Sequence, residues 1–183
     1  MTPARPRYPH IERLAEGLLH EAGVSAPPVP VERIVEARQI GLEASDLKDV
    51  SGLVVRRAGA VVIGVNKTHP ATRRRFTVAH ELGHALLHQG KPLRYDRDFR
   101  VDFRAGRSSL GSDVEEMEAN FFAACLLMPR SMLEADPLAA QLDAEDAAQT
   151  VAALARRYKV SPHAMAIRIG NLAVRRTAFG VGK

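Results

Sequence analysis

The chain is organised around one stretch, Arg73-Arg74-Arg75-Phe76-Thr77-Val78-Ala79-His80-Glu81-Leu82-Gly83-His84-Ala85-Leu86-Leu87-His88. It has the pattern of one continuous helix and contains the motif H-E-x-x-H. Residues four apart lie one above the other on a helix, so the imidazoles of His80 and His84 can converge on one metal ion. Glu81 flanks them, which suits a carboxylate that takes a proton from the attacking water. The stretch therefore predicts a catalytic metal site.

The other side of this helix is apolar and is expected to face a core, through Val78, Ala79, Leu82 and Leu86. The histidine side is then expected to line a cleft. Gly83 costs about 1 kcal/mol relative to alanine in a helix interior, so its presence indicates close approach by another backbone or by a substrate.

Composition indicates one globular domain of 183 residues, because 46% of the residues are hydrophobic and 26% are charged. No apolar run suits a membrane span and no secretory leader is evident, so a cytoplasmic protein is expected. The single cysteine, Cys125, lies in an apolar run and is expected to be buried and inert. The net charge of +5 permits an acidic partner, but the arginine clusters are short. Solvated helix faces are expected at 73–75, 156–157 and 175–176.

Before the motif, the periodicity predicts two helices and a small sheet. The helices are expected at 10–22 and 31–38, on either side of the break Pro27-Pro28-Val29-Pro30. A strand is expected at 40–44, and an antiparallel hairpin at 52–56 and 60–65. Thr72 is a candidate N-cap for the motif helix, which is expected to end at Gly90.

After the motif, the chain is expected to be largely helical. The stretch 91–111 is polar and hard to predict, and either a strand near 99–103 or a flap over the cleft would fit it. A second strong helix is expected from Ser112 to Met128, followed by helices at 144–158 and from Ser161-Pro162 to about Val174.

A catalytic zinc site normally has three protein ligands, so the two histidines need a third. The candidates are His88, Glu115, Glu116, Glu118 and the downstream acids. His88 lies roughly 12 Å along the helix axis from His80, at about 1.5 Å per residue, so a capping or surface role is expected for it. Glu116 shares a helix face with Asn120, which could hydrogen-bond a ligand histidine, and this arrangement favours Glu116 over Glu118.

Two segments together carry a family resemblance. They are Arg75-Phe76-Thr77-Val78-Ala79-His80-Glu81-Leu82-Gly83-His84 and Glu116-Met117-Glu118-Ala119-Asn120-Phe121-Phe122-Ala123-Ala124-Cys125-Leu126-Leu127-Met128-Pro129. In these the chain resembles the ImmA/IrrE metallopeptidase family over roughly residues 10–172. The resemblance implies a compact, zincin-like α+β domain, with a small antiparallel sheet, the H-E-x-x-H helix and a C-terminal helical part. Its E-x-x-A-N pattern places the third ligand on Glu116.

The organisation expected from this resemblance is a single metallopeptidase domain over 1–183. Residues 10–130 would form the zincin-like core and 131–174 a C-terminal helical subdomain, with flexible ends at 1–9 and 175–183. The implied activity is zinc-dependent cleavage of a specific protein, an Xre-type helix-turn-helix repressor, which relieves repression of stress-response or mobile-element genes. His80, His84 and Glu116 would bind Zn²⁺, with Mn²⁺ or Fe²⁺ as alternatives, and Glu81 would be the general base.

Several questions stay open at this level. An oxyanion donor is expected, and the candidates are Tyr95, Tyr158, His163 and the arginines of 91–111. The segment from Leu154 to Arg168 also has helix-turn-helix spacing, so the alternative function is a DNA-binding or repressor-binding module without turnover. A packed helical pair is the favoured interpretation of that segment. The sequence does not indicate the oligomeric state.

Overall fold

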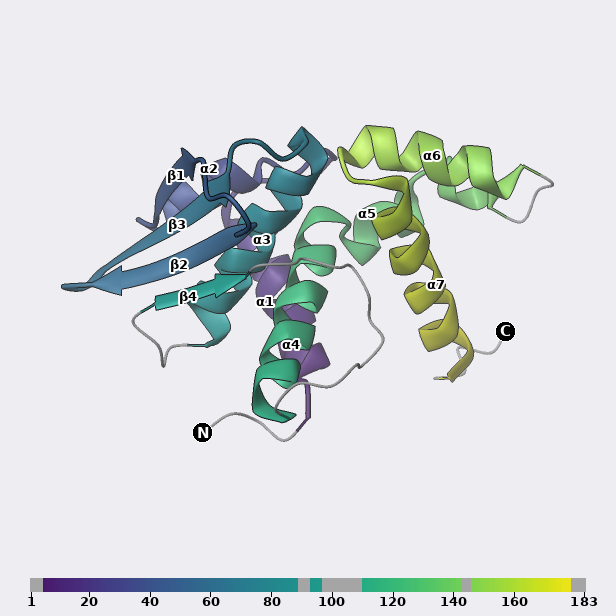
Figure 1. The fold of residues 1–183 in the computed structure, drawn as a ribbon. Helices are drawn as coiled ribbons and strands as arrows, with labels where there is room; N and C mark the ends of the chain where they lie inside the picture. Colours follow the sequence, from purple (N-terminus) through teal and green to yellow (C-terminus); the bar gives the residue numbers. More distant parts are fainter. Residues whose placement is uncertain (1–4, 89–92, 97–109, 143–145, 179–183) are drawn as a thin grey trace.

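The structure is a computed structural model that describes residues 5–88, 93–96, 110–142 and 146–178. Its architecture is α+β, as the sequence predicted, with one sheet and with helices throughout the chain (Figure 1). The elements in chain order are α1 (Tyr8–Glu21), α2 (Val31–Ala37), β1 (Gly41–Ser45), β2 (Gly52–Arg57), β3 (Ala60–Asn66), α3 (Ala71–Leu87), β4 (Leu93–Asp96), α4 (Leu110–Leu127), α5 (Arg130–Ala135), the 3-10 helix η1 (Ala139–Gln141), α6 (Ala147–Tyr158) and α7 (Pro162–Ala178).

The sheet has the strand order β1-β3-β2-β4. The predicted hairpin is confirmed, with β2 and β3 antiparallel and Arg57 opposite Ala60. Its turn residues Ala58 and Gly59 both have positive φ, 50° and 81°, which is the geometry of a tight two-residue hairpin turn. β4 pairs antiparallel with β2, whereas β1 joins β3 in parallel. The sheet is therefore small, as expected, but mixed rather than purely antiparallel.

Helix α3 is central to the fold, because it contacts β2 and β3 of the sheet as well as α2 and α4. Figure 1 shows it lying between the sheet and α4, with α1 against α4. Its predicted core face is confirmed, since Val78, Ala79 and Leu82 are buried and Leu86 packs against the core. The end of α3 is tied to the sheet, because Arg56 of β2 donates hydrogen bonds to the carbonyls of His84, Ala85 and His88.

The C-terminal helices α6 and α7 pack against each other and lie to one side of the sheet (Figure 1). The bend between them passes through Lys159, which has left-handed backbone angles. The hydroxyl oxygen of Ser161 then accepts a hydrogen bond from the Ala164 backbone N–H at 3.1 Å, so Ser161 caps α7 as predicted. Tyr158 and Met165 are fully buried, which confirms the packed pair expected for this segment.

Several local predictions are wrong. Thr72 is not the N-cap, because α3 begins at Ala71 after Pro70, and the helix ends at Leu87 rather than Gly90. Strand β4 was not predicted, since its four residues show no clear alternation of apolar and polar side chains. The strand or flap suggested near 99–103 lies outside the described residues.

The cluster at 73–75 is not a solvated face. Arg73 donates a hydrogen bond to the hydroxyl of Ser51. The side chain of Arg75 is only 14% exposed, and it contacts Glu32 and the Val29 carbonyl. These arginines fasten α3 to the segments before it. Within the described part of the chain, no helix is long and apolar enough to cross a membrane.

Candidate metal centre

His80, Glu81 and His84 all lie in the buried middle of α3, and each is 0% exposed. The Nε2 atoms of the two histidines face each other at 2.9 Å, and the ring planes are inclined at 76°. The predicted convergence of the two imidazoles is therefore present. The histidine face of α3 was expected to line an open cleft. In the structure the two histidines are instead fully buried.

Helix α4 brings Glu116 to the same point. Its carboxylate oxygens lie 3.3 Å from the Nε2 of His80 and 3.5 Å from the Nε2 of His84, and its side chain is 36% exposed. These three residues form a group whose donor atoms all lie within 4.8 Å of one another, as a metal site requires. Glu116 is also the member through which the group reaches solvent.

Gly83 explains how α3 and α4 come so close. A Cβ atom on Gly83 would lie 3.0 Å from the Cδ1 of Phe122 and 3.2 Å from the Cα of Ala119. The close backbone approach predicted for Gly83 is thus confirmed, and the approaching backbone is that of α4. This contact sets the distance from which Glu116 reaches the two histidines.

Asn120 lies on the same face of α4 as Glu116, as predicted, and its Oδ1 is 3.0 Å from the Nδ1 of His80. An amide oxygen only accepts hydrogen bonds, so the Nδ1 of His80 carries the proton. The Nε2 of His80 then presents a lone pair towards His84 and Glu116. Asn120 therefore holds His80 in the form that can bind a metal.

Burial keeps the second histidine neutral as well. It lowers the pKa of His84 to about 3, with a further contribution from the nearby His80. Burial would raise the pKa of Glu116, but the contacts with His80 and His84 outweigh it and lower that pKa, so the carboxylate is ionised. Two neutral imidazoles and one carboxylate that converge on a single point are a donor set that fits Zn²⁺.

His88 and Glu118 form an arrangement that the sequence did not indicate. His88 is not a surface residue, because it is only 9% exposed at the C-cap position of α3. Its Nδ1 is 2.9 Å from the Nδ1 of His84, and its Nε2 is 2.9 Å from the Oε2 of Glu118. Glu118 stays outside the metal group, as the preference for Glu116 expected. Its pKa falls to about 2, because hydrogen bonds from Arg7 and His88 outweigh the effect of burial.

Glu81 is held against the sheet, by β2. A Cβ atom on Gly52 of β2 would lie 2.5 Å from the Oε1 of Glu81 and 2.5 Å from the Cγ2 of Thr77. Only glycine fits between β2 and this carboxylate. The role of Gly52 could not be recognised from sequence, where it was only the start of a strand.

Among the oxyanion-donor candidates whose side chains the structure describes, Arg94 in β4 is the one that reaches the group. It pairs with both Glu115 and Glu116, and its side chain is 11% exposed. Tyr158 is fully buried beside Asp136, where burial raises its pKa, and His163 is exposed on α7. The side chain of Tyr95 lies outside the described part of the structure.

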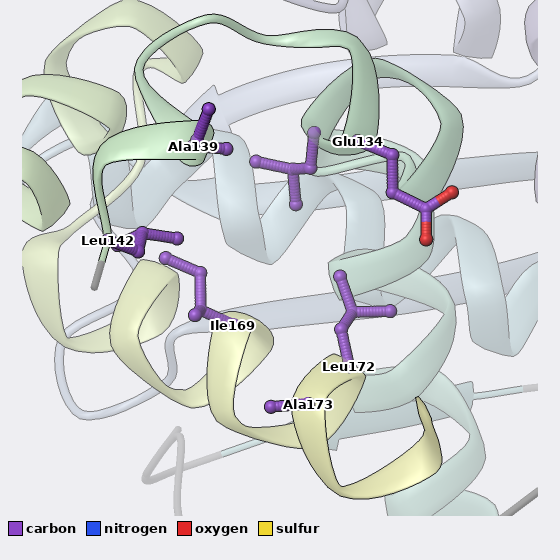
Figure 2. Close-up of a pocket in the computed structure, with 8 residues that line it drawn as sticks. Glu134, Ala139, Leu142, Ile169, Leu172 and Ala173 are labelled. Carbon is purple, nitrogen blue, oxygen red and sulfur yellow. The ribbon is translucent and has the colours of Figure 1, made fainter. Parts of the chain in front are cut away.

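An apolar cavity of about 290 Å³ lies elsewhere, between α5, η1 and α7 (Figure 2). Its lining contains none of the metal group, and a single carboxylate, that of Glu134, stands at its edge. The lining residues are Leu133, Glu134, Ala139, Ala140, Leu142, Ile169, Leu172 and Ala173.

Comparison with known proteins shows the family of this chain. No curated protein matches the chain. Among solved structures, a Mycobacterium tuberculosis transcriptional regulator is similar in fold, with a TM-score of 0.56 and 18% identity. The match covers 85% of this chain but 44% of that one, so this chain spans less than half the length of the regulator. The model of the peptidase family M78, described as the IrrE N-terminal-like domain, matches residues 35–170. The chain therefore belongs to the IrrE N-terminal-like peptidase family, as its two motif segments suggested.

Proposed function

We propose that the protein is a zinc metalloendopeptidase whose metal is held by His80, His84 and Glu116. The observation that carries this proposal is the convergence of two imidazole Nε2 atoms and one carboxylate beside the buried Glu81. Family membership supports the same reaction class. The nitrogen and oxygen donors favour Zn²⁺, and Mn²⁺ or Fe²⁺ are the competing ions.

Glu81 acts as the general base in this proposal. Zinc, when bound, supplies a Lewis acid that polarises the scissile carbonyl and makes water more acidic. The carboxylate of Glu81 takes the proton from the attacking water and delivers it to the leaving amine.

Other residues of the site would hold these groups in place. Asn120 keeps the lone pair of His80 directed at the metal position, and Gly52 fixes the position of Glu81. Arg94 is the described side chain best placed to donate a hydrogen bond to a substrate carbonyl at the metal, because its guanidinium already reaches Glu116.

The proposed substrate is an Xre-type helix-turn-helix repressor, whose cleavage would relieve repression of stress-response or mobile-element genes. Membership of a peptidase family supports a protein substrate. The alternative function is a module that only binds DNA or a repressor, without turnover. It gives no role to the buried Glu81 next to the metal group.

Proteolysis in a lysate of the host tests the proposal. Zinc-loaded protein and its Glu81→Gln variant are incubated in parallel with lysate, and new protein N-termini are identified by mass spectrometry. The proposal predicts a single cut in a small helix-turn-helix regulator, seen with the wild type and absent with the variant and after chelation. Identical N-termini in both samples, or no cut at full zinc occupancy, would contradict it.

A further inference from the structure

A series of hydrogen bonds runs outward from the second histidine of the motif and ends at Arg7. The Nδ1 of His84 contacts His88, and the Nε2 of His88 contacts Glu118. The carboxylate of Glu118 in turn accepts hydrogen bonds from the side chain of Arg7, which directly precedes α1. These hydrogen bonds thus link the N-cap of α1 and the C-cap of α3 to the middle of α4.

The chemistry of these groups fixes the direction of each hydrogen bond. The carboxylate of Glu118 accepts three hydrogen bonds from Arg7 and has only acceptor positions left, so the Nε2 of His88 carries the proton of their shared hydrogen bond. A neutral His88 then has a lone pair on Nδ1, and the Nδ1–H of His84 donates to it. The remaining nitrogen of His84, Nε2, is left with its lone pair directed at His80 and Glu116.

The hydrogen bonds around Glu118, at the outer end of this series, keep His88 protonated on Nε2. The Glu118 side chain is 0% exposed. Its Oε1 accepts from the backbone N–H of Arg7 at 2.7 Å and from the Nε of Arg7 at 2.9 Å. Its Oε2 accepts from the Nη2 of Arg7 at 2.7 Å and from His88 at 2.9 Å. All four lone pairs of the carboxylate are therefore occupied, and its orientation towards His88 is fixed.

An ion pair that only anchored α1 would need Arg7 and Glu118 alone. Here a histidine stands between that pair and His84, and both of its ring nitrogens are used. His80 has a partner of the same kind in Asn120. Each of the two motif histidines therefore has its Nδ1 engaged by a different residue, on a different element.

We propose that His88 is a positioning residue for the metal centre, and that Glu118 and Arg7 hold it so that His84 keeps its proton on Nδ1 and its lone pair on Nε2. This inference rests on the proposed metal site, and it assigns a role to residues beyond the H-E-x-x-H motif. Partners of metal-binding histidines typically contribute about 10- to 100-fold to metal affinity, so an effect of that size is expected.

The test reads the tautomers of the histidine rings in the metal-free protein, by two-dimensional ¹⁵N–¹H nuclear magnetic resonance of the imidazoles. The wild type is expected to show His80 and His84 both protonated on Nδ1. In His88→Leu, which has no acceptor, His84 is expected to lose this single form while His80 keeps it. His88→Gln, whose amide can accept from His84 and donate to Glu118, is expected to restore the Nδ1–H form.

Zinc affinity, measured by competition with a chromophoric chelator, gives the second readout. His88→Leu is expected to weaken binding about 10- to 100-fold, and His88→Gln to stay within a few-fold of the wild type. Should the leucine variant fail to fold, His88→Phe makes the same comparison with a ring that lacks both nitrogens. A wild-type His84 protonated on Nε2 would overturn the proposal, as would equal zinc affinity in all variants.

The two proposals can fail separately. The tautomers are read without metal or substrate, so absence of peptidase activity does not affect that result. Tautomers as expected in a protein that binds no zinc would overturn the proposed function and, with it, the metal role of His88. Zinc binding and proteolysis with no change in His88→Leu would overturn only the role of His88.

Discussion

Gly52 of β2 lies directly against the carboxylate of Glu81 in α3, at a distance that leaves no room for a side chain. A Cβ atom at position 52 would come within 2.5 Å of the Oε1 of Glu81, which is less than any normal contact. The sheet therefore does more than cover α3. At this point its backbone sets the position of the residue proposed as the general base.

We expect Gly52→Ala to lower peptidase activity about 100-fold while zinc binding is retained, because displacement of a catalytic group by about 1 Å has costs of that order. The measurements are turnover of the identified substrate and zinc stoichiometry. Gly17→Ala in α1 is the matched control, since a Cβ there meets nothing within 4 Å. Equal activity in the two variants would mean that the contact between Gly52 and Glu81 has no functional role.

Gly83 offers a test of the packing between α3 and α4. Valine at this position would press on Phe122 and on the backbone at Ala119, so we expect Gly83→Val to lower the free energy of unfolding by about 1–3 kcal/mol. Zinc affinity should fall as well, because Glu116 lies on the displaced helix. Gly170→Ala in α7, where nothing lies within 4 Å of the added Cβ, should leave zinc affinity unchanged and should raise the free energy of unfolding by up to about 1 kcal/mol, because alanine favours the helix. Chemical denaturation of the metal-free proteins makes the comparison.

The ion pair between Arg7 and Glu118 should make stability depend on pH. The pKa of Glu118 is lowered to about 2 in the folded protein, below its ordinary value of 4.5, so the unfolded chain binds this proton more readily. The stabilisation is present above pH 4.5 and is lost as the pH falls towards 2. We expect Arg7→Met to have a lower melting temperature than the wild type at pH 7, and the difference to shrink below pH 4.5. A difference that stays constant with pH would contradict this account of the pair.

Much of this arrangement follows from local sequence, and the rest does not. The helical spacing of His80 and His84 brings their rings together, and the spacing of Glu116 and Asn120 places both on one face of α4. The hairpin is signalled by its valines and by the turn at Gly59. These features depend on residues that are close in the chain, so periodicity is enough to predict them.

The features that sequence reasoning missed all depend on contacts between distant segments. His88 lies at the C-cap position, as the capping alternative expected, but nothing near it in the sequence indicates that Glu118 contacts its ring or that Arg7 holds Glu118. Arg94 and β4 are positioned by pairing with β2, and Arg75 is buried by the segment around Val29. Arginines that are expected to be solvated from the sequence can thus be partly buried and hydrogen-bonded to other segments.

Arg94 is expected to oppose metal binding electrostatically. Its guanidinium pairs with the same carboxylate that the metal would use, and its charge repels a cation. We expect Arg94→Gln to bind zinc about three- to tenfold more tightly, an effect of roughly 1 kcal/mol that should weaken at high salt. The exposed Arg33→Gln in α2 is the control for the change in net charge. Weaker zinc binding in Arg94→Gln would instead mean that Arg94 orients Glu116 for the metal.

Zinc titration of metal-free protein, for the wild type, Glu116→Gln and Glu115→Gln, tests the central claim most directly. The two acids are neighbours and both contact Arg94, but only Glu116 lies at the two histidines. We predict one zinc ion per wild-type chain, a loss of affinity of at least about tenfold in Glu116→Gln, and near wild-type affinity in Glu115→Gln. A wild type that binds no zinc, or equal affinity in the two variants, would contradict a metal centre at His80, His84 and Glu116.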